Sequence, residues 1–215
     1  MKCRCVAASP EAFVRQIVAS YLPNGYHYYV AGHVPDRDMN RPERVDQVLS
    51  AKYGTCVSKS VRSNLRRGGV ASIRYLRHDR FWLLIGTDGK RGLGQHHAYV
   101  HHFGRRPLTF HGYAVRLIDN KPMVYVDRFE FRHIKQTLMS LCCSGRYRDQ
   151  RYMAATIRNL FPFEPYAGVL EQFIRLIRQI NQRRSSQKFQ RVPLSMVTLR
   201  TTSTRTPRLV QSTKS

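Results

Sequence analysis

The spacing of apolar residues predicts six helices. In each of them, apolar side chains recur at intervals of three or four positions, which places them on one face of a helix. The first helix has the clearest start, with Ser9 as the capping residue and Pro10 at the first helical position. The predicted helices cover residues 10–21, 42–53, 58–67, 132–141, 150–160 and 166–182.

Segments rich in aromatic and β-branched residues lie between these helices and predict strands. They cover residues 26–34, 72–85, 98–103, 110–118 and 123–131, and the second is either one strand or a hairpin. Asp119 and Asn120 predict a tight turn that pairs the last two strands. This order predicts an α+β fold, in which a small mixed or antiparallel sheet of about 4–6 strands packs with about 4–6 helices. We expect residues 1–192 to form a single α+β domain.

The charge of the chain indicates its class of partner. There are 37 Lys and Arg residues against 13 Asp and Glu, a formal net charge of +24 at pH 7. Such an excess favours binding to polyanions, and nucleic acid is the leading candidate. The longest uninterrupted apolar run, Phe81–Ile85, is much shorter than the roughly 18 residues of a membrane-spanning helix. We therefore expect DNA or RNA as partner, no membrane, no small-molecule cofactor and a cytoplasmic location.

The end of the chain differs in composition from the rest. No acidic residue follows Glu171, and serine and threonine crowd the last positions. A segment of this kind buries too little apolar surface to offset the entropy lost on folding. We expect residues 193–215 to form a disordered cationic tail that gives a second, sequence-independent anchor for a polyanion.

The densest group of cations lies in the predicted helix 58–67 and in the segment that follows it. Helical residues three and four positions apart project from one side, and the planar guanidinium group suits bidentate contacts with phosphate. Tyr75 and Tyr28 lie among charged residues on predicted strands and are candidates for stacking on unpaired bases. The predicted nucleic-acid-binding residues are Lys59, Arg62, Arg66, Arg67, Arg74, Tyr75, Arg77, Arg80, Arg183 and Arg184.

The leading hypothesis is therefore a nucleic-acid-binding protein that contacts phosphates through an arginine-rich surface. By analogy with small basic α+β replication and transposition domains, we expect a protein of mobile-element, phage or plasmid type. A second hypothesis is a structural protein of a ribonucleoprotein assembly, whose charge is neutralised inside the complex.

A third hypothesis is a metal-dependent nuclease or nicking enzyme that uses the histidine-rich segment 96–102. His97 and His101 are the candidate ligands of a divalent metal, and they are also candidate catalytic residues together with Tyr152 as nucleophile. Tyrosine-dependent nicking enzymes use two histidines with a single apolar residue between them on a strand. Three residues lie between His97 and His101, so this spacing does not match.

Two further patterns are given a structural interpretation. The five cysteines are an odd set whose spacing fits neither a disulfide framework nor a zinc site, so we expect free thiols, with Cys56, Cys142 and Cys143 partly buried. The alternative is that Cys3 and Cys5 form half of a metal or redox site. The glycine-rich stretch 86–94 lacks the Ser or Thr that follows the lysine of a phosphate-binding loop, and it predicts a flexible surface loop.

Overall fold

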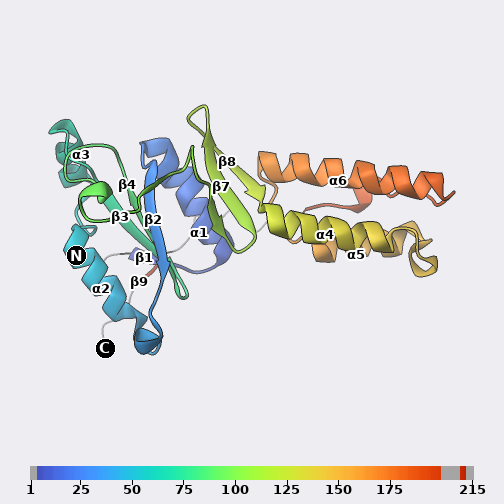
Figure 1. Ribbon diagram of the computed structural model, residues 1–215, viewed down its shortest axis with the longest axis horizontal. Helices are drawn as coiled ribbons and strands as arrows, with labels where there is room; N and C mark the ends of the chain where they lie inside the picture. Colours follow the sequence, from blue (N-terminus) through green and yellow to red (C-terminus); the bar gives the residue numbers. More distant parts are fainter. Residues whose placement is uncertain (1–3, 200–208, 212–215) are drawn as a thin grey trace. The chain divides into compact units, whose positions relative to one another are not determined.

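A computed structural model describes residues 4–199 and 209–211 of the chain (Figure 1). The described residues divide into two compact units. Unit 1 holds the described residues up to Leu108, the segment Val115–Pro122 and the C-terminal strand β9. Unit 2 holds Thr109–Ala114 and the described residues from Met123 to 199. Because compactness does not show whether either unit folds alone, the single domain over residues 1–192 stays a prediction.

Unit 1 is built on a six-stranded sheet with the order β5-β2-β4-β3-β1-β9. Strands β1 and β3 are parallel, and the neighbouring pairs β1–β9, β2–β4, β2–β5 and β3–β4 are antiparallel. The strands are β1 Arg4–Ala7, β2 Tyr28–His33, β3 Ile73–His78, β4 Phe81–Gly86, β5 His101–His102 and β9 Leu209–Gln211.

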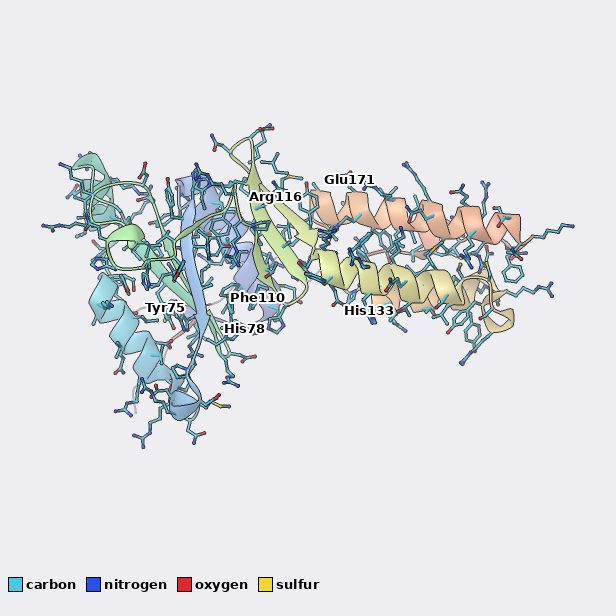
Figure 2. All side chains as sticks on the ribbon, in the orientation of Figure 1. Tyr75, His78, Phe110, Arg116, His133 and Glu171 are labelled. Carbon is cyan, nitrogen blue, oxygen red and sulfur yellow. The ribbon has the colours of Figure 1, made fainter. Side chains whose placement is uncertain are left out.

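Helices lie on both sides of this sheet, as Figure 1 shows for α1 and α2. Helix α1 (Pro10–Gln16) begins at Ser9, whose hydroxyl accepts a hydrogen bond from the Ala12 amide at 3.1 Å, and continues as a wider turn over Ile17–Tyr21. Helix α2 (Pro42–Tyr53) packs Tyr53 against a buried cluster that contains Tyr75 and Leu84 (Tyr75 is labelled in Figure 2). Helix α3 (Lys59–Arg67) follows α2.

A three-stranded sheet, β6-β7-β8, contributes residues to both units. Its strands are β6 Leu108–Phe110, β7 Tyr113–Ile118 and β8 Lys121–Val126. Asp119 and Asn120 both have positive φ, 49° and 59°, between β7 and β8. The predicted tight turn is therefore confirmed, since two positive φ angles match the twist of a two-residue hairpin.

Unit 2 contains three helices, α4 Arg128–Leu141, α5 Gln150–Leu160 and α6 Ala167–Ser186. Their buried faces supply an apolar core of Ile134, Leu138, Met153, Ile157, Phe161, Phe173, Leu176, Ile177 and Ile180. The outer faces are mostly polar, with His133 exposed on α4 and Glu171 on α6 (Figure 2), although each helix also exposes one large side chain, Phe129, Tyr152 or Leu170. The Gln172 side chain joins α6 to β8, because its oxygen accepts from the Val126 amide at 2.7 Å and its nitrogen donates to the Val126 carbonyl at 3.1 Å.

The α+β prediction is confirmed, with six α-helices and two sheets among the described residues. The segment 72–85 is a hairpin, and the segment predicted as strand 123–131 ends at Val126 because the Asp127 carboxylate caps α4 by accepting from the Phe129 amide at 3.0 Å. Strand β1 was not predicted, because four residues are too few to show a period. Among the described residues, no helix is long and apolar enough to cross a membrane.

The predicted tail from residue 193 onward differs from expectation where the structure describes it. Leu194–Met196 form a 3-10 turn, Val197 is buried, and the Met196 carbonyl accepts from Arg158 at 2.7 Å. Leu209–Gln211 pair with β1. The rest of the predicted tail, 200–208 and 212–215, lies outside the described residues.

The cysteine prediction holds in part. Cys142 and Cys143 are free thiols, whereas Cys56 is disulfide-bonded, so the expectation of a free thiol is wrong at that position.

Candidate nucleic-acid interface

Helix α3 is a surface helix that carries four cations, Lys59, Arg62, Arg66 and Arg67. The Ser58 hydroxyl caps it by accepting from the Val61 amide at 3.3 Å, and none of its residues is buried. Arg62 and Arg66 are one turn apart, and like charges at this spacing weaken a helix by a few tenths of a kcal/mol. The pair Arg62 and Arg66 therefore has some cost to the helix, which the favourable position of Arg66 and Arg67 near its C-terminal end offsets in part.

These cations line a pocket of about 490 Å³. The pocket brings together residues from α3, from β3 and from the segment that follows α1. They are Gln16, Ser20, Tyr21, Asn24, Tyr26, Lys59, Arg62, Ser63, Arg66, Arg67 and Arg74. Five of these residues are cations and none is acidic. Five residues of the predicted binding set, Lys59, Arg62, Arg66, Arg67 and Arg74, therefore converge, and we call the site the α3 pocket.

Neutral groups hold the guanidinium groups of the α3 pocket in place. Arg62 donates to the Val57 carbonyl, Arg74 donates to the Thr55 carbonyl at 3.3 Å, and Arg67 donates to Asn64 at 2.9 Å. Arg66 lies over the ring of Tyr26, 4.8 Å from its centre. Within the described part of the chain, none of these arginines forms an ion pair. The groups are oriented while their charge remains uncompensated.

The electrostatics of the pocket favour an anion. Burial lowers the pKa of Arg62 below its ordinary value, and the positive charge of Arg74 lowers it further. Both effects disfavour the charged guanidinium, and both would be offset by a bound anion, which brings negative charge to the same place.

Tyr21 adds a donor to the α3 pocket. The residue is 4% exposed, and its hydroxyl makes no hydrogen bond of good geometry with any described residue, while Arg74 and Gln16 lie close enough to act as donors toward its oxygen. Burial raises the pKa of this hydroxyl, and the charge of Arg74 opposes the rise. The hydroxyl therefore keeps its proton. A buried hydroxyl proton without a well-placed acceptor is uncommon in native proteins, and here it lines a cationic pocket where an anionic oxygen would satisfy it.

The structure places Tyr75 and Arg77 in the interior. Tyr75 and Arg77 are 2% and 6% exposed. Both bind the buried Asp46 of α2: Tyr75 donates to it at 2.7 Å, and Arg77 donates through two nitrogens at 2.7 and 2.9 Å. These side chains do not reach a ligand at the surface of this fold, which corrects their assignment as surface residues.

The remaining predicted residues do not line the α3 pocket. Arg80 is exposed and forms an ion pair with Asp36. Arg183 and Arg184 belong to unit 2, where Arg183 is exposed and Arg184 is 0% exposed. The Arg184 guanidinium donates to the carbonyls of Cys142, Tyr147, Arg148 and Gln190. Arg184 is therefore a structural residue, which corrects its assignment as a surface contact.

The histidine segment does not bring metal ligands together. His97 is hydrogen-bonded to the Tyr53 hydroxyl at 2.6 Å, whereas Arg106 donates to His101 at 3.4 Å. Burial lowers the pKa of His97, and nearby Lys52 and His96 lower it further. Tyr152 lies in unit 2, whereas both histidines lie in unit 1. No group of three or more His, Cys, Asp or Glu residues among those described is arranged to hold a metal ion.

Comparisons with known proteins give no additional argument. No protein-family model matches the chain, and no curated protein matches it. The functional argument therefore depends on the geometry of unit 1.

The sequence indicated the cations of the α3 pocket but not its tyrosines. Tyr21 continues the apolar face of the first helix, so its spacing predicts a core residue, which it also is. Tyr26 was assigned to a strand, yet its hydroxyl is hydrogen-bonded to Ser72 at 3.0 Å while its ring supports Arg66. Tyr21 and Tyr26 come next to the basic helix only in the folded chain, so the linear sequence gives no signal that places them in the pocket.

Proposed function

We propose that the chain binds nucleic acid by holding backbone phosphates in the α3 pocket. The observation that carries this proposal is the convergence of five cations with a buried tyrosine hydroxyl whose proton has no well-placed acceptor, in a pocket whose described lining residues include no acid. Arginine side chains with fixed orientation suit phosphate oxygens, and a protonated hydroxyl donates to the same oxygens. The net charge of +24 supports a polyanion as partner over an isolated small anion.

Binding of this kind depends on the backbone and not on the base sequence. Each duplex phosphate that a cation neutralises adds about 0.9 to the slope of log affinity against log salt concentration. We therefore expect affinity for unrelated sequences to be similar and to fall steeply with salt. A structural role in a ribonucleoprotein would use the same surface, with RNA as the preferred partner.

A salt series tests the proposal. The full chain is titrated with single-stranded DNA, duplex DNA and RNA of equal length, with polyglutamate as a non-nucleic polyanion. We expect at least one nucleic acid to bind much more tightly than polyglutamate, with a steep salt slope. Equal affinity for polyglutamate, or binding to nucleic acid that does not respond to salt, would show the proposal to be wrong.

A further inference from the structure

A second pocket lies over the opposite face of the same sheet. Tyr28, which lines it, packs against the buried cluster that contains Tyr75. Arg74, which lines the α3 pocket, is the neighbour of Tyr75 on β3 and faces the other way because side chains alternate along a strand. The second pocket measures about 640 Å³, within the range of about 300–1,000 Å³ for small-molecule sites.

One wall of this pocket is a glycine loop held in a fixed position. Gly89 has a φ of 135°, and a Cβ atom there would lie 2.8 Å from the Ala71 nitrogen and 2.9 Å from the Gly69 oxygen. The backbone amide of the next residue, Lys90, donates to the Gly69 carbonyl at 2.8 Å, and the Lys90 carbonyl accepts from the Ala71 amide at 2.8 Å. The loop is therefore tied to the chain that follows α3, in contrast to the flexible surface loop expected from its composition.

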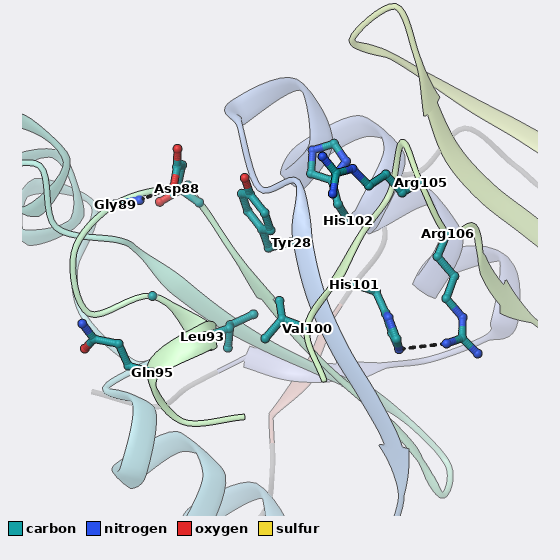
Figure 3. A pocket seen from close by; sticks show the side chains of 13 residues that line it. Tyr28, Asp88, Gly89, Leu93, Gln95, Val100, His101, His102, Arg105 and Arg106 are labelled. Atoms are coloured by element: carbon teal, nitrogen blue, oxygen red, sulfur yellow. Dashed lines mark hydrogen bonds between the residues drawn. The ribbon is translucent and has the colours of Figure 1, made fainter. Parts of the chain in front are cut away.

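The cationic end of the pocket is formed by β5 and the residues after it. His101, His102, Arg105 and Arg106 all line it, and Figure 3 shows them as two pairs: Arg105 reaches toward His102 near Tyr28, whereas Arg106 is bonded to His101 and both point the other way. The Gly104 amide donates to His102 Nδ1 at 3.1 Å, so the neutral ring carries its proton on Nε2 and presents a donor there. Within the described residues, the Arg105 side chain has no ion-pair partner.

The middle of the pocket is lined by an aromatic ring and two aliphatic side chains. The end away from the arginines contains a hydrogen-bond acceptor. Tyr28, Leu93 and Val100 lie in the middle, and Asp88 and Gln95 lie on the side away from the arginines (Figure 3). The ring of His102 meets the ring of Tyr28 edge to face at 5.1 Å, which fixes the tyrosine plane. Asp88 accepts from the Gly89 amide at 2.8 Å through one oxygen, and this bond orients its carboxylate.

We propose that this second pocket binds a nucleotide unit. The phosphate would lie against Arg105 and His102, with Arg106 and His101 adding positive charge from the other side of β5, and the base would stack on Tyr28. An exocyclic amino group of the base would donate to Asp88. The three zones follow the order of a nucleotide's own parts: an anion, a planar ring system and a donor at the ring edge. A free mononucleotide and an unpaired nucleotide of a strand present the same chemistry, and the proposal does not depend on the α3 pocket.

The histidines give this site a pH signature. Burial lowers the pKa of His102, and His27 and Arg105 lower it further; burial and then Arg106 lower the pKa of His101. A bound phosphate brings negative charge, which raises both pKa values, so binding takes up protons and strengthens as the pH falls. Among the described residues, the other charged or titratable groups that face this site are Asp88, His27, Tyr28, Tyr29 and the two arginines.

Calorimetry on the full chain tests the proposal with adenosine 5′-monophosphate. Inorganic phosphate and adenosine are the comparison ligands. We expect the nucleotide to bind at least about tenfold more tightly than either part alone, because both ends of the pocket are then occupied. Arg105→Gln with Arg106→Gln should weaken nucleotide binding about tenfold or more, and Tyr28→Leu by a similar factor. Inorganic phosphate or adenosine binding as tightly as the nucleotide would overturn the proposal.

Two controls separate this site from general attraction to a basic protein. Arg151→Gln with Arg175→Gln removes the same charge from exposed positions of unit 2, outside both pockets, and should leave mononucleotide affinity unchanged. Uridine 5′-monophosphate lacks an amino group, so it should bind several-fold more weakly than the adenosine or cytidine nucleotide, and Asp88→Asn should reduce that preference. An equal loss from the two arginine pairs would contradict the assignment, while oligonucleotide binding to the α3 pocket could still stand.

A dinucleoside monophosphate distinguishes the two sources of the ligand. Its diester keeps a constant charge between about pH 5.5 and about pH 7.5, so any change in affinity over that range reports the protein. We expect affinity to rise as the pH falls, and this rise to be lost in His101→Gln with His102→Gln. Tighter binding of the dinucleotide than of the mononucleotide would assign the pocket to a strand, and the reverse would assign it to the free nucleotide. A pH dependence unchanged in the double variant would contradict the proposal.

Discussion

The α3 pocket of unit 1 and the C-terminal end of α6 in unit 2 both collect arginines, yet they use them in opposite ways. In the α3 pocket, Arg62, Arg66 and Arg74 are oriented by neutral groups and face a hollow with no acidic residue. At the end of α6, the Arg184 guanidinium is enclosed and four carbonyls accept from it. The comparison shows that an arginine becomes a binding residue when its hydrogen bonds leave its charge accessible, and a structural one when they surround it.

Within unit 1, removing a buried arginine should lower the unfolding free energy much more than removing an exposed arginine does. Arg77→Met leaves Asp46 as a buried carboxylate that keeps only the Tyr75 hydrogen bond, and we expect unfolding free energy to fall by about 3–5 kcal/mol. The matched control is Arg80→Met on the same hairpin, whose exposed ion pair with Asp36 should contribute about 1 kcal/mol or less. Urea unfolding of both variants measures the difference, and equal losses would refute the distinction.

Arg184 should matter for stability and not for binding. Arg184→Met removes the donor from four carbonyls, and we expect a loss of about 3 kcal/mol in urea unfolding. Arg183→Met, at the exposed neighbouring position, should change stability by about 0.5 kcal/mol at most. Nucleic-acid affinity of the folded Arg184→Met protein should match that of the parent chain, and a selective loss of affinity would return Arg184 to the binding surface.

The two tyrosines of the α3 pocket should separate binding from stability. Tyr21→Phe removes a hydroxyl whose proton has no well-placed acceptor within the described residues, so stability should change little, while affinity for nucleic acid should fall about tenfold. Tyr26→Phe removes the hydrogen bond to Ser72 and should lower stability by about 1 kcal/mol with a smaller effect on affinity. Melting curves and filter binding on both variants measure this, and a destabilised Tyr21→Phe with normal affinity would argue against a phosphate contact.

Local sequence patterns predicted most elements of the fold. Ser9 with Pro10, Asp119 with Asn120, and the periodic segments near α2, α3, α5 and α6 each carry a short-range signal that the structure confirms. The missed strands β1 and β9 are held by partners distant in sequence. Their pairing depends on tertiary contacts, which the local spacing of apolar residues cannot predict.

The site was predictable only in part, for a related reason. The helical spacing of Lys59, Arg62 and Arg66 brings them to one side whatever the rest of the fold does. Whether Arg77 points outward depends on Asp46, which lies 31 positions earlier on another element. Likewise, the pocket formed by Tyr28, Asp88 and Arg105 draws on three segments that only the folded sheet brings together.

The most direct measurement is the salt slope of oligonucleotide affinity in two charge-matched double variants. Arg62→Gln with Arg66→Gln removes two cations of the α3 pocket, and Arg151→Gln with Arg175→Gln removes two exposed cations of unit 2. On duplex DNA, the first pair should reduce the slope by about 1.8, from two phosphate contacts at about 0.9 each, and the second pair should leave it nearly unchanged. Equal reductions in both variants would contradict the claim that unit 1 gathers its cations into a phosphate site.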